Sequence, residues 1–383
     1  MTITYIIDDK LGGIASLICN LINNKIDDSS RQEIILLDKV ESNHSKIPYH
    51  FNVDKEITLT VSSTENAYSL VRKLYKLLPD QPGVVVLNDS LEMQMLDHIP
   101  SKLTSYQIVH DEYNFSLALR YPNVVDVFVA HSKLYFEALK KELPERVGTI
   151  FYLPHGVTVS SYSRKHQDKI NVIRLLFLGR MSETKGIFDL PKIAYELKKL
   201  NVPYEFTCIG NGPELDTLKK LWEHDTSVIF LSPNTTDDIL RICAQHDVFV
   251  FPTQFEGTPV ALLETMSVGL VPIATDLPGG ITEIVTHDIG FRIPIGNVQL
   301  FSRAIKNLFD NPELLNRLST ACREKIKNDF NVKNTAAAYH ELFSKYVELY
   351  SAKQIKRQKL GFRLDHPWIP NEIVKLARTL RRL

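Results

Sequence analysis

Short runs of β-branched and aliphatic residues alternate with longer amphipathic segments along most of the chain, and this alternation restricts the possible folds more than any other feature. A strand followed by a covering helix and a second strand is the unit from which parallel sheets are built. The first half therefore predicts a parallel sheet with helices on its faces. Its predicted strands are Ile3–Ile7, Glu33–Leu37, Val84–Leu87, Gln107–Val109 and Asp126–Ala130.

A polar stretch at residues 160–170 interrupts the alternation, which then begins again. From about Pro312 only helical patterns remain, with a break between Gly361 and Pro370. We expect an α/β protein with two Rossmann-like domains, 1–159 and 171–335, facing each other across a cleft, and C-terminal helices at 336–383 that cross back or contact a membrane. The predicted strands of the second half are Leu175–Leu178, Glu205–Ile209, Val228–Leu231, Val248–Phe251 and Val271–Ala274.

The charges of the 383-residue chain balance, with 45 Lys and Arg against 45 Asp and Glu. A protein that binds nucleic acid over much of its surface normally has an excess of basic residues, so we expect no nucleic-acid partner. No apolar run approaches the roughly 18 to 20 residues that span a membrane, and the N-terminus lacks the pattern of a secretory signal. We expect a cytoplasmic protein.

Four cysteines lie far apart, without a C-x-x-C pair or a histidine at zinc spacing. This spacing favours free thiols over a disulfide framework or a metal site. We therefore expect no metal centre. The cysteines are Cys19, Cys208, Cys243 and Cys322.

The segment from Phe251 to Glu264 leaves a predicted strand and enters a predicted helix. Thr258 suits the N-cap position, Pro259 the first helical position, and Gly269 the C-terminal stop. The amides of the first helical turn, at Val260 and the residue after it, would then be free to bind a phosphate or another anion.

Two carboxylates flank this anion site, Glu256 in the loop and Glu264 within the helix. Carboxylates repel phosphate but accept hydrogen bonds from hydroxyl groups. A nucleotide sugar has that layout, with ribose on one side of the diphosphate and a hexose on the other. The spacing fits equally well with a solvated loop glutamate and an exposed helix glutamate.

Two further loops of the second half follow predicted strands. Gly179, Arg180 and Lys185 follow the first one, where two cations could neutralise a diphosphate leaving group, although loop cations are commonly solvated. Gly210 begins a G-x-G turn after the next strand. This turn lacks the third glycine of a dinucleotide fingerprint because Leu215 stands there, so we interpret it as a tight turn near a ligand.

In the first half, Gly12 and Gly13 open a helix after the first strand, where bare backbone could approach a phosphate or an acceptor. His110 stands at the carboxyl end of a predicted strand, where ligands bind in open parallel sheets. A structural role for this histidine remains an alternative.

These segments together resemble the retaining glycosyltransferases of family 4, which have the two-domain GT-B fold. The Glu256 to Glu264 spacing matches the E-x₇-E motif of that family. Gly179-Arg180 with Lys185-Gly186 matches its G-R-x-x-x-x-K-G loop, and Gly12-Gly13 matches its N-terminal glycine pair. The resemblance runs from the first strand to about Phe330.

The resemblance implies transfer of a sugar from a nucleotide diphosphate sugar, such as a UDP- or GDP-sugar, to an acceptor hydroxyl with retention and without a metal. Arg180 and Lys185 would bind the diphosphate, Glu264 the ribose hydroxyls and Glu256 the donor sugar. His110 would orient the reacting groups at the anomeric centre. Further donor contacts would come from Gly12, Gly13, Gly210, Gly257, Thr258, Pro259 and Val260.

The same resemblance implies a role in bacterial polysaccharide or glycoconjugate synthesis, such as lipopolysaccharide, capsule or O-antigen, with a glycan or lipid-linked acceptor. Three other classes stay open. Glu256 and Glu264 could serve a glycoside hydrolase, and a nicotinamide oxidoreductase is disfavoured by Leu215. The chain could also be a non-catalytic scaffold or partner subunit in polysaccharide assembly.

The C-terminal segment predicts a basic amphipathic helix. Ile373, Leu376, Ala377, Leu380 and Leu383 follow helical spacing, and four cations lie largely on the other side. Such a helix can lie on an anionic membrane surface, or it can pack against its own protein with its cations in solvent. The cations are Lys375, Arg378, Arg381 and Arg382.

Overall fold

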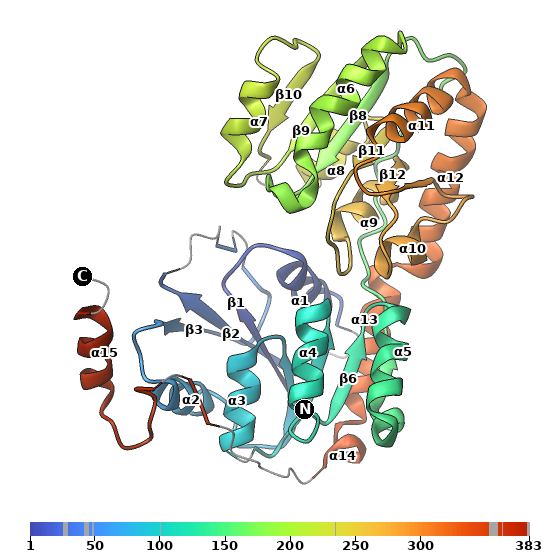
Figure 1. The fold of residues 1–383 in the computed structure, drawn as a ribbon. Coiled ribbons are helices and arrows are strands. Elements are labelled where there is room, and N and C mark those ends of the chain that lie inside the picture. The colour runs from blue at the N-terminus through green and yellow to red at the C-terminus, as the bar shows by residue number, and fades with distance from the viewer. Residues whose placement is uncertain are drawn as a thin grey trace. The chain divides into compact units, whose positions relative to one another are not determined.

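The computed structural model describes residues 1–25, 30–41, 46–47, 50–99, 101–233, 235–351, 359–361 and 363–380. The chain forms two compact units (Figure 1). The first unit contains Met1–Pro154 and Lys333–Leu383, and the second contains His155–Val332. The chain passes from one unit to the other after Pro154 and returns after Val332.

The first unit is built on a seven-stranded, fully parallel sheet with the order β3-β2-β1-β4-β5-β6-β7. Its strands are β1 (Thr2–Asp8), β2 (Arg31–Lys39), β3 (Lys55–Val61), β4 (Gly83–Leu87), β5 (Leu103–Val109), β6 (Val127–Ala130) and β7 (Ile150–Tyr152). Its helices are α1 (Gly13–Asn23), α2 (Ala67–Tyr75), α3 (Ser90–His98), α4 (Glu112–Arg120), α5 (Lys133–Glu142), the 3₁₀ helix η1 (Pro144–Thr149), α13 (Val332–Ser344, whose first residue closes the second unit), α14 (Tyr346–Leu349) and α15 (Asn371–Leu380).

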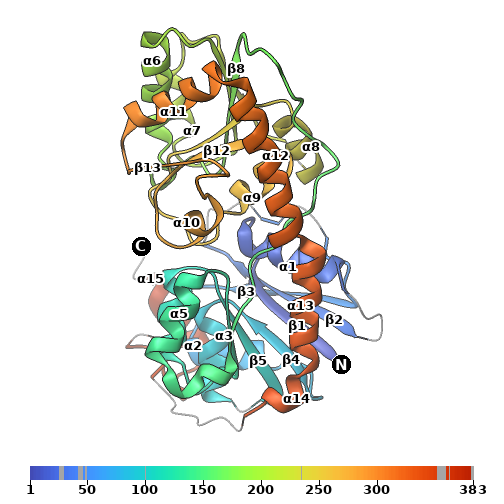
Figure 2. The same ribbon diagram turned by 90° about the vertical axis from the view of Figure 1, so that its right-hand side faces the viewer.

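Helices cover both faces of this sheet, so its central strands are apolar on both sides. Helices α2, α3, α4 and α5 bury their apolar residues on one face, while α1 and the returning helix α13 cover the other (Figure 2). The α13 side chains are held by aromatic packing, including Tyr106 against Phe343, and by a hydrogen bond from Tyr106 Oη to the Leu342 carbonyl. The end of the chain thus completes the core of the first unit.

The second unit repeats the plan with a six-stranded parallel sheet of order β10-β9-β8-β11-β12-β13. Its strands are β8 (Ile173–Leu178), β9 (Tyr204–Ile209), β10 (Val228–Leu231), β11 (Val248–Phe251), β12 (Val271–Thr275) and β13 (Phe291–Ile293). Its helices are η2 (Glu183–Lys185), η3 (Ile187–Asp189), α6 (Leu190–Lys199), α7 (Leu215–Leu221), α8 (Thr236–Cys243), α9 (Val260–Ser267), α10 (Gly280–Ile284), α11 (Val298–Asp310) and α12 (Pro312–Asp329).

Both sheets have the strand order of a Rossmann fold. In each parallel sheet, the direction in which the chain adds successive strands reverses once. The reversal lies between β1 and β4 in the first unit and between β8 and β11 in the second. Loops that leave neighbouring strands there diverge to opposite faces, which opens a ligand-binding crevice beyond the carboxyl ends. The strand order therefore identifies where a site is expected in each unit.

All ten predicted strands are confirmed, with ends that differ by a few residues at most. Three strands were missed in the sequence. Strand β3 alternates exposed and half-buried residues at the edge of its sheet, and β7 and β13 contain only three residues each. Edge position and shortness weaken the apolar signal on which the prediction depends.

The polar stretch at 160–170, predicted to be a linker, lies inside the second unit. Arg164 explains why, because its side chain is buried and its Nε lies 2.8 Å from Asp247 Oδ1, just before β11. The Arg164 amide also donates to the Val268 carbonyl. A charged residue thus attaches this stretch to the sheet, which a polar composition alone does not reveal.

Candidate functional site

The loops after β8, β9 and β11 pack closely at the carboxyl edge of the second sheet. Gly186 and Gly210 have positive φ angles of 68° and 139°, a conformation that favours glycine. A Cβ at Gly210 would collide with the Gly179 carbonyl oxygen, and one at Gly186 with that of Pro252. The predicted turn at Gly210 is thus a close approach of two backbones, which fixes the loop that carries Arg180.

Lys185 and Glu256 form an ion pair across the reversal point of this sheet. The Lys185 Nζ lies 2.5 Å from Glu256 Oε1, and the two side chains are 25% and 10% exposed. Lys185 ends the turn that follows β8, while Glu256 stands in the loop after β11. The structure therefore joins two residues that lie 71 positions apart and that the sequence assigned to one site.

Backbone contacts hold the two loops in register around this pair. The amide of Gln254 donates to the Thr184 carbonyl at 2.9 Å, and Thr253 Oγ1 donates to the same oxygen at 3.3 Å. Burial raises the pKa of Glu256, and the ammonium group of Lys185 opposes that shift. Glu256 is therefore a partly buried carboxylate stabilised by one cation, which contradicts the interpretation as a solvated loop residue.

Arg180 lies beside this pair in the chain but has different surroundings. Its side chain is exposed, and no residue in the described part of the chain pairs with its guanidinium group. The main chain next to it is fixed, because the Gly179 amide donates to Ile209 and the Met181 amide to Asn211, at 3.0 and 2.9 Å. An anchored backbone thus carries a cation that is available to an anion.

Helix α9 begins one residue later than the sequence predicted. Pro259 occupies the N-cap position, not Thr258, and no side chain caps the helix. The Thr258 hydroxyl is buried and has no hydrogen-bond partner among the described residues. The first intrahelical bonds come from Leu262 and Leu263 to the Pro259 carbonyl, so the amides of Val260 and the next residue have no intrahelical acceptor.

The end of α9 follows the prediction. Gly269 adopts a φ of 94°, and the amide of Leu270 donates to the Thr265 carbonyl at 3.1 Å. This reversed turn is the usual way in which a glycine stops a helix. The loop before α9 is also confined, because a Cβ at Gly280 would lie 2.6 Å from the Gly257 carbonyl oxygen.

Glu264 is half-buried on α9, and burial raises the pKa of its carboxyl group to about 7. No described residue forms an ion pair or a hydrogen bond with this carboxyl group. A carboxylate without a partner is costly to bury, and a hydroxyl-bearing ligand would supply the missing donors. The interpretation of Glu264 as an exposed surface residue is therefore wrong.

In the first unit, Gly12 and Gly13 lie at the N-terminus of α1, directly after β1. Gly12 is the N-cap residue, and a Cβ built on it would meet no atom within 4 Å. The helix has no side-chain cap and no acidic residue in its first turn. Its first amides are therefore uncovered, as the glycine pair predicted.

His110 follows β5 and is oriented by Asn88, which follows β4. Its Nε2 lies 2.9 Å from Asn88 Oδ1, and the Asn88 amide nitrogen donates to the Ile6 carbonyl at 2.9 Å. That bond holds the amide oxygen toward the histidine, so the ring donates to it through Nε2 and its orientation is fixed. The His110 ring also packs edge to face on His131, with centroids 4.8 Å apart.

A cluster of charged residues at the carboxyl edge of the first sheet was missed in the sequence analysis. Lys39, at the end of β2, lies 2.7 Å from both Asp8, the last residue of β1, and Asp89, which follows β4. The Tyr113 hydroxyl donates to Asp89 as well. Asn88 and Asp89 directly follow a predicted strand, so their position could have identified them, but the pairing with Lys39 depends on the strand order.

The described residues contain no group of three or more His, Cys, Asp or Glu that could hold a metal ion. All four cysteines are free, and Cys208, Cys243 and Cys322 are buried. Within the same residues, no helix is both long and apolar enough to cross a membrane.

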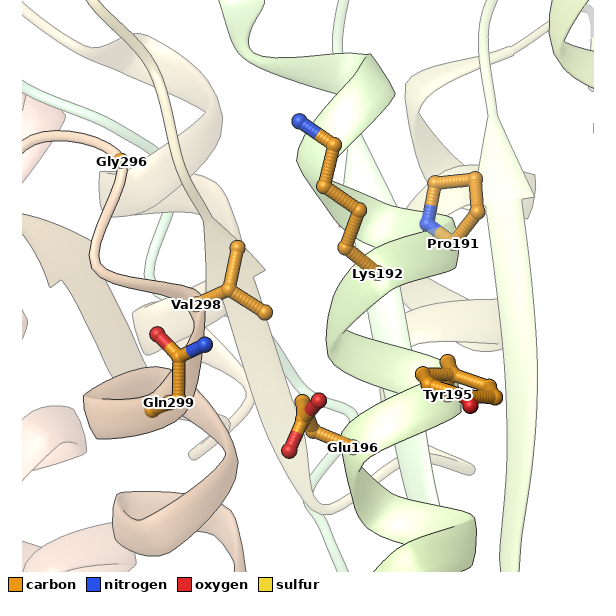
Figure 3. A pocket seen from close by; sticks show the side chains of 7 residues that line it. All are labelled: Pro191, Lys192, Tyr195, Glu196, Gly296, Val298 and Gln299. Carbon is orange, nitrogen blue, oxygen red and sulfur yellow. The ribbon is translucent and has the colours of Figure 1, made fainter.

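A hollow of about 520 Å³ lies between α6 and α11, lined by side chains from both helices and from the turn before α11 (Figure 3). Glu196 faces Gln299 across it. None of the predicted site residues lines this hollow. The site geometry described above thus belongs to the strand ends and not to this surface.

The sequence of the second unit matches a known family. Residues 159–325 match the family model of the glycosyl transferases group 1. The chain is also 26% identical over 314 residues to an Escherichia coli protein, the UDP-Gal:alpha-D-GlcNAc-diphosphoundecaprenol alpha-1,3-galactosyltransferase. That alignment covers 74% of this chain and 80% of the relative.

Solved structures resemble the whole fold. Sucrose-phosphate synthase from Thermosynechococcus elongatus superposes with a TM-score of 0.74 at 16% identity, covering 91% of this chain and all of that one. HepE from Anabaena, solved with UDP and glucose, superposes with a TM-score of 0.70 at 15% identity, covering 90% and 100%. Identities this low show the fold alone.

Proposed function

We propose that this chain, whose residues 159–325 match the glycosyl transferases group 1, is a glycosyltransferase that transfers a hexose from a nucleoside diphosphate sugar to an acceptor hydroxyl with retention of anomeric configuration. The observation that carries this proposal is the Lys185–Glu256 pair at the reversal point of the second sheet, beside the unpaired cation of Arg180 and the uncapped helix α9. These groups combine charges for a diphosphate with acceptors for sugar hydroxyls.

Lys185 and Arg180 are proposed to bind the diphosphate. An ammonium group has three N–H donors, so Lys185 can keep its bond to Glu256 and still donate to a phosphate oxygen. Arg180 adds a charge that no protein carboxylate neutralises. Both cations stabilise the negative charge that builds up on the leaving diphosphate, which is a role that needs no metal ion.

The other predicted site residues of the second unit are proposed to bind the hexose at one end of the donor and the ribose at the other. The amide of Val260, the backbone of Gly257 and Pro259 and the partnerless Thr258 hydroxyl would bind beside Glu256, which accepts hydrogen bonds from the hexose. Glu264 would accept from the ribose hydroxyls, and Gly210 lets the backbone approach the ligand. UDP is the nucleotide that we favour, because the E. coli relative is named for UDP-Gal and HepE was solved with UDP.

In the first unit, His110 is proposed to orient the reacting groups, since the bond to Asn88 fixes the direction of its ring. Gly12 and Gly13 would present backbone amides to the donor or the acceptor. The proton of the acceptor hydroxyl would pass to the departing phosphate oxygen on the same face of the sugar. That route retains the anomeric configuration without a protein nucleophile.

We further propose that the acceptor is a glycan or a lipid-linked glycan of bacterial polysaccharide or glycoconjugate synthesis, handled by a cytoplasmic protein at the membrane surface. The E. coli relative supports this, because its name describes a galactosyltransferase that acts on a diphosphoundecaprenol-linked sugar. No nucleic-acid partner is proposed, in line with the balanced charge of the chain.

The test is transfer from a panel of UDP- and GDP-sugars in the presence of EDTA, with NMR of the anomeric proton of the product. The proposal predicts transfer from one donor, unaffected by EDTA, with the anomeric configuration of the donor. An inverted product contradicts retention. Hydrolysis of glycans without use of any nucleotide sugar would instead support a glycoside hydrolase.

A further inference from the structure

Helix α15 exposes its apolar side to solvent and uses its cations to bind the first unit. Lys375 Nζ lies 2.7 Å from Glu65, and the Arg378 guanidinium lies 2.6 Å from the buried carboxylate of Asp365. Val374 is fully buried beneath the helix. This arrangement contradicts the alternative in which the apolar side of the helix packs against its own protein while Lys375 and Arg378 lie in solvent.

The position of α15 is determined by the N-terminus of α2 (Figure 1). The Asn66 amide donates to Asn371 Oδ1 at 2.8 Å, and the Ala67 amide donates to Asp365 Oδ1 at 2.7 Å. The Asn66 side chain also donates to the carbonyl of Ile369. Polar bonds with fixed geometry therefore select which side of α15 faces outward.

The outward side is a ridge of large apolar side chains. Ile373, Leu376 and Leu380 are 58%, 63% and 62% exposed, and their spacing of three and four residues places them on one stripe of the helix. Trp368, just before the helix, is 74% exposed and stacks on His366. Single exposed apolar residues are common, but three on one stripe of a helix, with an exposed tryptophan just before that helix, favour a surface that binds a partner.

The surroundings of this apolar ridge are basic. A hollow of about 410 Å³ beside Trp368 is lined by Arg72 and Lys73 of α2 and by Lys76, which directly follows that helix. Lys73 shares Glu65 with Lys375, whereas Arg72 and Lys76 have exposed side chains and no recorded ion pair among the described residues. Among residues 359–361 and 363–380, which the structure describes, there are four Lys or Arg and two acidic residues, Asp365 and Glu372.

We propose that the apolar ridge of Trp368, Ile373, Leu376 and Leu380 inserts into the headgroup region of an anionic membrane, with the Arg72–Lys76 hollow receiving a lipid phosphate. Tryptophan and aliphatic side chains favour that interface, and cations near an anionic leaflet are attracted to it. Membrane binding through this surface would bring the protein to a lipid-linked acceptor. That biological role rests on the proposed function, whereas the binding itself does not.

A second copy of the chain is a poorer partner for this surface. A symmetric dimer places each patch against its own equivalent, so Arg72 and Lys76 of the two copies would approach each other and repel. An anionic bilayer instead complements both the apolar and the charged parts of the surface. The charge around the apolar ridge thus favours lipid as the occupant.

The test is flotation of the full-length protein with vesicles of phosphatidylcholine alone or with about a quarter phosphatidylglycerol. We expect binding to the anionic vesicles only, weakened by added salt. Leu376→Glu should lower the affinity at least about tenfold, since it replaces an inserted apolar side chain with an anion. Val347→Glu is the matched control, because Val347 is 69% exposed on α14 outside the patch, and it should bind as the wild type does.

Absence of wild-type flotation, or equal flotation of the wild type and Leu376→Glu, would overturn the proposal. Self-association that Leu376→Glu abolishes, without vesicle binding, would assign the apolar ridge to a second copy and equally overturn it. The vesicles contain no glycan acceptor, and nucleotide-sugar binding is measured separately on the same preparations. Failure of the membrane surface is therefore distinguishable from failure of the glycosyltransferase proposal.

Discussion

Lys185 and Glu256 are joined by a 2.5 Å ion pair that links the loops after β8 and β11. These strands are neighbours at the point where the strand order of the second sheet reverses. A charge pair that is largely buried at this point is placed where Rossmann-like sheets bind ligands. The pair therefore lies at the centre of the proposed donor site.

Lys185→Ala is expected to lower kcat/KM at least about a hundredfold, because it removes a positive charge opposite the leaving diphosphate. Initial rates at varied donor concentration give the measurement. Lys192→Ala is the control, since Lys192 forms a 2.8 Å ion pair with Asp189 on the surface of the same unit. Equal rates in both variants would remove Lys185 from the site.

Glu256→Gln is expected to reduce kcat more than nucleotide binding, because the proposed partner of Glu256 is the sugar and not the nucleotide. The glutamine keeps the shape of the side chain but loses its charge attraction to Lys185. Titration with UDP and with UDP-sugar separates the two effects. A matching loss of affinity for both ligands would indicate that the loop has collapsed.

Donor binding is expected to depend on pH through the ionisation of Glu264. Its pKa of about 7 means that the ionised form, which accepts hydrogen bonds from ribose hydroxyls, becomes populated as the pH rises through neutrality. Nucleotide-sugar affinity should increase up to about tenfold from pH 6 to pH 8. A nucleotide sugar is the right probe, because its diphosphate diester does not titrate in that range. A flat profile for the wild type would contradict the assignment.

Ionisation of the same carboxyl group is expected to have the opposite effect on stability, which should fall as the pH rises. Its pKa is raised from 4.5 in the unfolded chain to about 7 when folded, so the native state holds a proton that the unfolded state releases between these values. Its contribution to the free energy of unfolding therefore falls as the pH rises through this window, by up to about 3 kcal/mol. Glu264→Gln should raise the Tm at pH 8 and leave it nearly unchanged at pH 4.5. A lower Tm at pH 8 would show that Glu264 has a stabilising partner.

Arg164→Ala tests the attachment of residues 160–170 to the second unit. The change leaves the buried carboxylate of Asp247 with hydrogen bonds from Gln167 and the Arg174 amide but without its charged partner. Breaking a buried ion pair in this way typically costs about 3 to 5 kcal/mol. Denaturant unfolding should show a clear drop in midpoint. Arg174→Ala is the control, because the Arg174–Glu205 pair is exposed on both sides and should cost less than about 1 kcal/mol.

The sheets were predictable from the sequence because buried parallel strands have continuous apolar runs. Strand β3 was not, since its alternating, exposed residues resemble a loop with scattered apolar positions. The returning helix α13 was predicted as a helix, but its packing against Tyr106 depends on contacts more than 230 residues apart. No local pattern encodes such a contact.

The candidate site shows the same division. Glu256, Lys185 and Glu264 were identified by spacing and resemblance, whereas the ion pair between the first two appears only once β8 and β11 lie side by side. The Lys39 cluster was missed because its pairing also depends on which strands lie side by side. For α15 the helix was predicted, but its orientation depends on Asp365 and Glu65, which lie outside the helix. Arg381, Arg382 and Leu383 lie outside the described residues.

The central claim is that the strand ends of the second unit bind a nucleoside diphosphate sugar through Arg180 and Lys185. Calorimetric titration of UDP- and GDP-sugars in EDTA tests it most directly, using the wild type, the Arg180→Ala Lys185→Ala variant and the Lys192→Ala control. We expect one nucleotide sugar to bind the wild type and Lys192→Ala with the same affinity, and to bind the double variant at least about a hundredfold more weakly. Unchanged affinity in the double variant, or no binding of any nucleotide sugar to the wild type, would contradict it.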